Sequence, residues 1–558
     1  MGERQYQRAV YLAQRNGHYA AARLLRGFKE RVSLSESGLG DGRVLDTIRP
    51  QGPPGSPQTF GLPAGHRSKP DCRALPSPIV VDQDQILTLR DGTTIRADIY
   101  RPKTDNKVPA IIMWGAYGKS GSGPLNIGPM PGCAGIPAER LSGYEDSEGL
   151  DPAEWVPRRY AIINYFIAAL RPPHLTAIAP LEGLSDLFRE QAYRGGIPYA
   201  TFPESIAQAL LGRQQQEDLV TAIKSTTTTN DYIEDKRVDM SKIQVPAYIG
   251  ASYGNKLHVV GSFRAFEEIP HDKKWLAANA THEWHGLYTD ERTTDLARFF
   301  DYFLRDVKND WPQTPPVRLP IMRCTQPARL DTPFNDLPWH TDSAVRNNLY
   351  LRPDLKLSTE APSQEGKVEY KASTDEKVTF AYTFPSKTVL TGPSTLGVDI
   401  SSPDHDDLDV YAHLYKADKD GNILSHLNLP TMLEALSPEQ RGLLTHNCLL
   451  RYWGPHGQLR ASQRHVSPEK SGKTWKTLSY EKVQRVKPGD VVKLGIQLWP
   501  TGLQFEAGEQ LLLTISGARL TFPALPGLAP DPNPNQGKHV LHLGGQFEGR
   551  LEFFNIDV

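Results

Sequence analysis

The sequence lacks any apolar run approaching the roughly 20 residues that a membrane-spanning helix needs. It has only four cysteines, which lie far apart and form no C-x-x-C pair: Cys72, Cys133, Cys324 and Cys448. This spacing indicates neither a zinc site nor a disulfide framework. The formal net charge is −1, so the chain also lacks the positive field that nucleic acid or an anionic membrane would require. We therefore expect no metal, no nucleic-acid partner and no membrane association.

The first residues show no targeting signal. No charged stretch is followed by an apolar one, and MGERQY lacks the Ser or Thr at the sixth position that N-myristoylation prefers. A cytoplasmic protein is therefore expected. Residues 4–31 read as helical; a single ankyrin-type helix pair or an Arg-rich mitochondrial presequence are alternatives, and an accessory helix or extension is the favoured interpretation.

The length of 558 residues predicts two or three domains, because single cores stop growing well below that size. Residues 33–78 are rich in Gly, Pro and Ser and predict a linker, so residues 1–78 are expected to form an N-terminal extension with order beginning near Ile79. A hairpin is predicted around Asp91-Gly92.

The segment 79–340 is expected to be an α/β domain. Short apolar runs predict buried strands of a parallel sheet, and amphipathic patterns between and after them predict helices. The polar segment 202–242 interrupts this alternation and predicts a helical cap. The predicted strands are VPAIIMWG (108–115), YAIIN (160–164), AIAP (177–180), VPAYIG (245–250) and KWLAANA (274–280); the helices are GSFRAFEEI and DLARFFDYFLRDV.

From 345 to 558 the pattern changes to short alternating strands separated by turn residues, which predicts an all-β sandwich or jelly roll. An acidic cluster lies in this part of the chain. Its spacing is not that of an EF-hand, so a solvated turn is expected rather than a calcium site; its members are Asp404, Asp406, Asp407 and Asp409.

Two motifs invite a catalytic or cofactor role. Gly250-Ala251-Ser252-Tyr253-Gly254 spells the G-x-S-x-G of a nucleophile elbow, which makes Ser252 an alternative nucleophile. Gly118-Lys119-Ser120 mimics the end of a P-loop, but the required glycine five positions earlier is Met113, so no phosphate-binding cofactor is expected.

Several segments, in order, resemble the serine α/β-hydrolases that include cocaine esterase, α-amino-acid ester hydrolases, glutaryl acylases and X-Pro dipeptidyl peptidases. The resemblance runs from about Ile86 to the C-terminus and implies an α/β-hydrolase sheet with a helical cap and a C-terminal jelly roll. The segments are LRDGTTIRADIYRP, WGAYGK, EGLDPAEWVPRRYAIIN, AALRPPHLTAIAPLEGLSDLFREQAY, VPAYIGASYGNKLH, THEW, LTGPSTLGVDISS, DDLDVYAHL, GQLRASQR and KPGDVVKLGIQL.

The resemblance implies roles for three residues. His282 matches the catalytic base, Tyr117 matches the tyrosine that donates to the oxyanion, and Asn255 stands where the family has the triad Asp. In the family the nucleophile precedes the ALRPPHL segment, whereas VPAYIG leads to the acid loop, so GASYG is expected to match the elbow pattern by coincidence. THEWH is not H-E-x-x-H, so zinc is not indicated.

The segment that should carry the nucleophile is missing. Only Tyr165 separates the strand YAIIN from FIAALRPPHL, although a parallel crossover needs a dozen or more residues. We therefore expect a sheet that lacks one interior strand. Three interpretations stay open: a disabled hydrolase of a small-molecule ester or amide, a non-catalytic binding or scaffold protein, and a transcript that has lost an exon. The oligomeric state and the substrate are not indicated.

Overall fold

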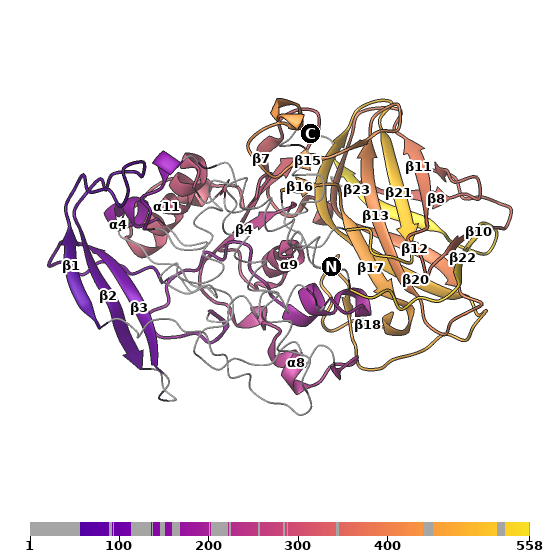
Figure 1. The fold of residues 1–558 in the computed structure, drawn as a ribbon, viewed down its shortest axis with the longest axis horizontal. Coiled ribbons are helices and arrows are strands. Elements are labelled where there is room, and N and C mark those ends of the chain that lie inside the picture. Colours follow the sequence, from indigo (N-terminus) through magenta and orange to yellow (C-terminus); the bar gives the residue numbers. More distant parts are fainter. Residues whose placement is uncertain are drawn as a thin grey trace, which may run out of the picture. The chain divides into compact units, whose positions relative to one another are not determined.

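A computed structural model describes residues 56–88, 92, 94–112, 136, 138–144, 151–158, 168–199, 201, 221, 225–254, 257–282, 285–286, 288–341, 345–438, 441, 450–521 and 531–556. The chain divides into two compact units. The first comprises residues 1–161 and 203–222, and the second comprises residues 162–202 and 223–558. Figure 1 shows the strands and helices of both.

The first unit contains a three-stranded antiparallel sheet. Its strands are β1 (Gln58–Leu62), β2 (Ile79–Thr88) and β3 (Thr94–Pro102), in the order β1-β2-β3. The predicted hairpin is confirmed, since β2 pairs with β3 from Ile79↔Pro102 to Thr88↔Thr94. Ordered structure begins earlier than the expected Ile79, because β1 pairs with β2. Leu62 of β1 and the alternate side chains Ile79 and Val81 of β2 share a small core with the helix α4 (Pro152–Arg158).

The second unit contains a four-stranded sheet. Its strands are β4 (Ala247–Ser252), β5 (Lys274–Asn279), β6 (Val317–Ile321) and β7 (Arg329–Phe334), in the order β4-β5-β6-β7. The pairs β4–β5 and β5–β6 are parallel, and β7 is antiparallel. Parallel bridges at Ile178 and Leu181 extend this order beyond β4. Every residue of β4 is buried, which fits the apolar run from Ala247 to Ala251.

The predicted helices flank these strands. They are α9 (Val259–Glu268) and α11 (Asp290–Leu304), which agree with the two amphipathic patterns. The side chain of Thr289 accepts from Arg292 N and caps α11. Shorter elements are α8 (Asp231–Asp235) and one-turn helices η1 (Ala138–Arg140), η2 (Phe188–Ala192), η3 (Arg194–Gly196), η4 (Met240–Lys242), η5 (Trp311–Gln313), η6 (Pro338–His340), η7 (Leu433–Ala435) and η8 (Ala461–Gln463).

One predicted strand is wrong over the part that the structure describes. Residues 108–112 form no strand, and Ile112 is 50% exposed, so they are not buried on both faces as a central strand requires. Residues 113–115, the strand predicted at 160–164 and most of the predicted cap lie outside the described residues. The expected loss of one interior strand therefore stays a prediction.

The C-terminal third is an antiparallel β domain, as predicted. A seven-stranded sheet packs against a five-stranded one around a shared apolar core (Figure 1). The first sheet contains β8 (Val345–Leu351), β9 (Leu357–Ser358), β10 (Gly366–Lys371), β12 (Thr388–Ser401), β20 (Val492–Phe505), β22 (Lys538–Leu543) and β23 (Arg550–Ile556); the second contains β11 (Lys377–Thr383), β13 (Asp409–Ala417), β14 (Ile423–Leu424), β17 (His456–Arg460) and β21 (Gln510–Ser516).

Two short antiparallel strand pairs also belong to this domain. β15 (His426–Leu427) pairs with β16 (Arg451–Tyr452), and β18 (Val466–Ser467) pairs with β19 (Thr477–Leu478). The first pair contacts the loop after β5 through His426, and the second contacts Arg189 through Leu478.

The end of β6 joins the β domain through its backbone. Met322 N donates to Gly502 O at 2.8 Å, and Gln504 N donates to Met322 O at 3.0 Å. The buried Lys416 of β13 reinforces this junction, because its Nζ donates to Arg323 O at 3.0 Å and Gln504 O at 2.7 Å. It also lies 2.8 Å from Glu509 Oε2. The buried ammonium of Lys416 thus contacts two backbone carbonyls and one carboxylate.

Replacing Lys416 by Met should therefore destabilise the protein strongly. The change leaves Glu509, whose side chain is 14% exposed, without its cation, and it removes one hydrogen-bond donor from each of two backbone carbonyls. Loss of one partner of a buried pair costs about 3–5 kcal/mol. Urea unfolding followed by tryptophan fluorescence measures this loss.

The matched control is Lys493→Met in the same domain. Lys493 lies 3.1 Å from Glu548, and both side chains are more than half exposed, so the cost should be about 0–1 kcal/mol. Equal losses for the two variants would contradict the structural role given to Lys416.

Candidate functional site

The candidate site lies at the carboxyl ends of β4 and β5. These strands are parallel and in register to their last residues, Ser252 and Asn279. Ser252 Oγ donates to Thr281 O at 3.1 Å, so the end of β4 touches the loop that follows β5. Ligands of open parallel sheets bind at this edge. The register therefore brings the ends of the two strands together.

His282 lies in the loop after β5 and is 1% exposed. Its backbone N donates to Asn428 O at 2.9 Å, and its carbonyl accepts from the backbone N of His285 and Gly286. Thr281 Oγ1 also lies 3.3 Å from Nδ1 of His285, a side chain whose pKa is lowered by burial. The position of His282 is thus fixed by its own backbone as well as by its neighbours.

Ser252 has the geometry of a strand residue rather than of an elbow. It is 1% exposed and ends β4, and its φ is not among the positive values of the described residues. Its hydroxyl donates to Thr281 and accepts from Gly254 N at 3.2 Å. A nucleophile elbow instead strains the serine on a sharp turn that leads directly into a helix. Here α9 begins only at Val259.

The two glycines of the motif are explained by packing. A β-carbon at Gly250 would lie 2.8 Å from Leu181 Cδ2, in the segment that forms a bridge with β4. A β-carbon at Gly254 would overlap the carboxamide of Asn428. The intervening Tyr253 stacks on Phe263 of α9 with 5.7 Å between ring centroids. These neighbours account for both glycines without a catalytic turn, which favours the coincidental interpretation of G-x-S-x-G.

The other two predicted site residues, Tyr117 and Asn255, lie outside the described residues. Their assignment as oxyanion donor and as occupant of the acid position therefore stays a prediction. The structure describes Tyr253 and Gly254, which precede Asn255. The contact from Ser252 to Thr281 holds this stretch close to the loop of His282.

Sequence reasoning missed two residues of the C-terminal β domain that reach this edge. His426 Nε2 donates to Ala280 O at 2.8 Å, and Asn428 Nδ2 donates to Gly254 O at 3.3 Å. Neither residue belongs to a recognisable motif. They are separated from His282 by more than 140 residues, so the sequence held no local signal for this contact.

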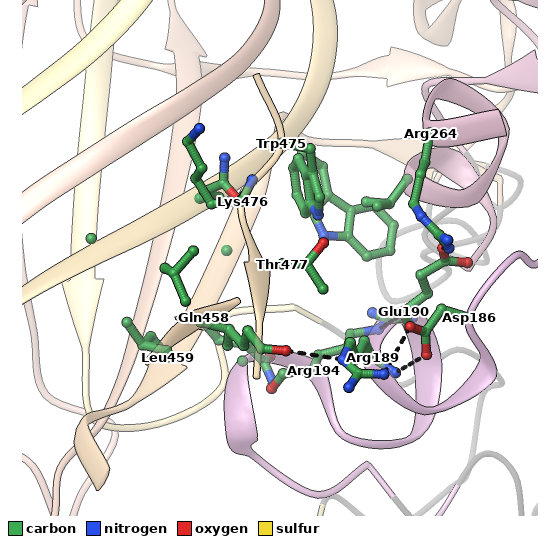
Figure 2. Close-up of a pocket in the computed structure, with 18 of the residues that line it drawn as sticks. Asp186, Arg189, Glu190, Arg194, Arg264, Gln458, Leu459, Trp475, Lys476 and Thr477 are labelled. Carbon is green, nitrogen blue, oxygen red and sulfur yellow. Dashed lines mark hydrogen bonds and ion pairs between the residues drawn. The ribbon is translucent and has the colours of Figure 1, made fainter. Parts of the chain in front are cut away.

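A cavity of about 100 Å³ lies elsewhere, between residues 186–195 with α9 and the strands of the β domain (Figure 2). Neither His282 nor Ser252 lines it. Arg194 lies over the ring of Trp499, 4.6 Å from its centroid, and its Nε donates to Glu190 O. Arg264 donates to the buried Glu190 and Ser185. The charged side chains that line this cavity therefore bind largely to one another.

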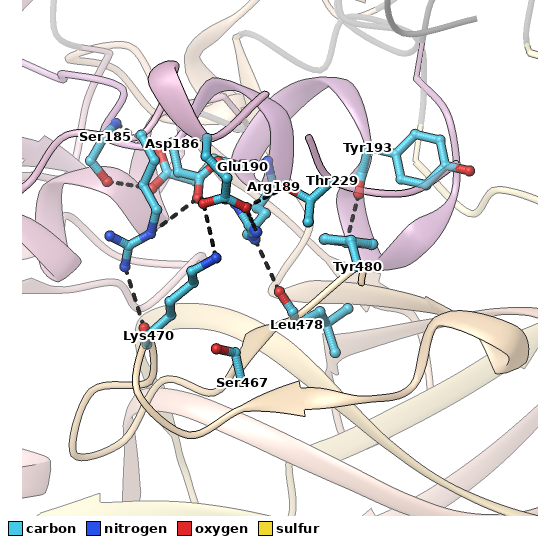
Figure 3. A network of polar contacts seen from close by, with 12 residues as sticks. Ser185, Asp186, Arg189, Glu190, Tyr193, Thr229, Ser467, Lys470, Leu478 and Tyr480 are labelled. Carbon is cyan, nitrogen blue, oxygen red and sulfur yellow. Dashed lines mark hydrogen bonds and ion pairs between the residues drawn. The ribbon is translucent and has the colours of Figure 1, made fainter. Parts of the chain in front are cut away.

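A polar network next to the cavity joins the segment 185–196 to the β domain (Figure 3). Arg189 donates from Nε to Leu478 O at 3.0 Å and from a terminal nitrogen to Glu234 Oε1 at 2.6 Å. The hydroxyl of Tyr480 donates to Tyr193 O at 2.8 Å. Burial raises the pKa of Glu190, and the charge of Arg264 acts in the opposite direction. The network holds β18, β19 and the following residues against the segment 185–196.

The acidic cluster matches its prediction in part: Asp404 and Asp406 are exposed, as expected of a solvated turn. Asp407 and Asp409 are buried rather than solvated, because each has fixed partners. Asp407 accepts from the backbone N and hydroxyl of Ser462, and Asp409 accepts two hydrogen bonds from Arg460 at 2.6 and 2.7 Å. Within the described part of the chain, no cluster of His, Cys, Asp and Glu has an arrangement that could hold a metal ion.

Comparison with known proteins gives one family match and several similar structures. The X-Pro dipeptidyl-peptidase C-terminal non-catalytic domain matches residues 309–552. A CocE/NonD family hydrolase from Staphylococcus aureus has a TM-score of 0.75 at 25% identity, covering 86% of this chain and 94% of that one. No curated protein sequence matches the chain.

Two more distant structures share the fold. An aminopeptidase from the marine sediment archaeon Thaumarchaeota archaeon has a TM-score of 0.58 at 12% identity, covering 85% of this chain and 96% of that one. An α-amino acid ester hydrolase has a TM-score of 0.57 at 13% identity with the same coverage. The class defined by the fold is thus a hydrolase-like protein with a C-terminal β domain. The chain is thus similar to CocE/NonD family hydrolases and carries a match to the X-Pro dipeptidyl-peptidase C-terminal domain, in agreement with the family that its motifs predict.

Glu234 of α8 makes the network pH-sensitive. Burial tends to raise the pKa of Glu234, but hydrogen bonds from Thr229, Arg189 and Lys470 outweigh it and lower the pKa from 4.5 to about 2. A lowered pKa contributes stability that is present above pH 4.5 and is lost as the pH falls towards 2. Glu234→Gln should therefore cost on the order of 1–2 kcal/mol at pH 7, since water partly screens the carboxylate, and should flatten the acid limb.

Urea unfolding at a series of pH values between 7 and about 2 measures both effects. Asp235→Asn is the control, because the Asp235 side chain is 74% exposed in the same helix. Parallel stability curves for the wild type and Glu234→Gln would show that the ion pairs of Glu234 contribute nothing.

Proposed function

We propose that the protein has the α/β-hydrolase core of its relatives and that its site is built to bind a small-molecule ester or amide. The observation that carries this proposal is the contact between the ends of β4 and β5. It sets His282 beside the loop that leads to Asn255, at the edge where parallel sheets bind ligands. The likeness to a CocE/NonD family hydrolase over most of both chains supports it.

The proposed chemistry is acyl transfer to water. In such a reaction His282 takes a proton from the attacking oxygen and returns it to the leaving group. Tyr117 donates its hydroxyl to the oxygen that becomes negative in the tetrahedral intermediate. Asn255 orients the imidazole in place of a carboxylate. An attacking serine is the part for which the sequence offers no good residue.

Ser252 is a poor substitute for that serine. Its hydroxyl donates to Thr281 O, and it sits in a buried strand rather than on a strained turn. Loss of a triad nucleophile costs on the order of 10⁶ in kcat, which leaves substrate binding and weak catalysis by the oxyanion donor. The protein with this sequence is therefore proposed to lack efficient serine-hydrolase activity.

The second candidate function is that of a non-catalytic binding or scaffold protein. An amide at the acid position and a serine committed to backbone partners favour it, because both leave a shaped site without its reactive groups. Transcript sequence across the codons for residues 164–166 decides whether an omitted exon would restore the nucleophile.

We also propose a cytoplasmic location. Cys72 and Cys324 carry free, buried thiols, as a reducing compartment allows. None of the helices in the described part of the chain is long and apolar enough to cross a membrane.

A fluorophosphonate probe tests the chemistry, because it labels activated serines. The wild type and Ser252→Ala should both show only background labelling, since an unactivated hydroxyl reacts slowly. Intact-mass measurement quantifies the label, and an active serine esterase serves as the positive control. Stoichiometric labelling that Ser252→Ala abolishes would overturn the proposal and make GASYG a working elbow.

A further inference from the structure

The segment His426–Asn428 of the β domain lies across the ends of β4 and β5. It contacts each of the two loops that the candidate site requires. On the β5 side, His426 Nε2 donates to Ala280 O at 2.8 Å, and Asn428 O accepts from His282 N at 2.9 Å. On the β4 side, Asn428 Nδ2 donates to Gly254 O at 3.3 Å. One residue, Asn428, therefore contacts both loops.

The contact with Gly254 is also steric. A β-carbon at residue 254 would overlap the side-chain carboxamide of Asn428. Gly254 has no positive φ, so its backbone conformation suits other residues. The space taken by Asn428 is thus the reason why a side chain does not fit there. This makes Gly254 and Asn428 a complementary pair across 174 residues of sequence.

The segment itself is held rigidly. Asn428 N donates to Leu450 O at 3.0 Å, next to the pairing of β15 with β16. Burial lowers the pKa of His426, which keeps its imidazole neutral with one N–H for Ala280. The hydrogen bond from His426 to Ala280 is therefore made by a neutral imidazole.

We infer that Asn428, supported by His426, is a positioning residue that sets the spacing between the Gly254 loop and His282. The domain to which it belongs carries the family description "non-catalytic", yet it supplies the group that both loops contact. The role of Asn428 in catalysis rests on the proposed function. Its role in setting the spacing of the two loops does not depend on that function. The fluorophosphonate experiment tests the proposed function, and it does not use the variants described below.

A double-mutant cycle tests the inference. Gly254→Ala should push Asn428 away and speed hydrogen exchange of the His282 amide roughly tenfold, the change expected when about 1.4 kcal/mol of local stability is lost. Asn428→Ala removes the carboxamide and should give a smaller acceleration. The combined variant should return to within about threefold of the wild type, because the added methyl group fills the vacated space.

Chemical shifts of the His282 ring, assigned with His282→Gln, provide the readout that a general loss of stability would not move. They should shift in Gly254→Ala and return towards the wild type in the combined variant. Gly495→Ala is the control, since no atom lies within 4 Å of a β-carbon placed there, and it should leave both readouts unchanged.

Two results would overturn the inference. One is normal exchange and normal His282 shifts in Gly254→Ala. The other is a combined variant as disturbed as Gly254→Ala alone, which would mean that Asn428 does not mediate the effect. If Gly254→Ala does not fold, Asn428→Ala alone must alter the His282 shifts, and unchanged shifts in it refute the positioning role.

Discussion

The parallel pairing of β4 with β5 is the constraint on which the candidate site depends. Six consecutive residue pairs keep the strands in register, so β4 and β5 end at the same level of the sheet. The direct contact from Ser252 to Thr281 follows from that register. A slip by one residue would move each side chain to the opposite face of the sheet and separate the loops. The arrangement of His282 is therefore a property of the sheet before it is a property of any single side chain.

Buried charges connect this sheet to the β domain. Arg189 and Lys416 each lie among carbonyls and carboxylates that come from distant parts of the sequence. Loss of one partner while the other stays buried would leave an unpaired charge, which is costly in a low-dielectric interior. The β domain therefore holds the segments around β4 and β5 in place as well as covering them.

Local patterns predicted the elements well and their neighbours poorly. The apolar runs and amphipathic periods predicted β4, β5, α9 and α11, because each depends on residues close in sequence. The reasons for Gly250 and Gly254 could not be predicted, since Leu181 and Asn428 lie far away. The same limit applies to Asp409, whose partner Arg460 makes it a buried residue rather than a solvated one. The sequence placed His282 through resemblance, and the chain order alone could not place His426 beside it.

The junction at Met322 bears on how this architecture could have been assembled. The family match begins at residue 309, so it includes β6, which pairs with β5 outside the match. At Met322, the first residue after that strand, the backbone is already hydrogen-bonded to β20. The matched segment thus contains β6 and β7, which form one edge of the neighbouring sheet. A recombination event that joined such a module to a new partner would transfer a ready-made strand interface, and with it the angle at which the two parts meet.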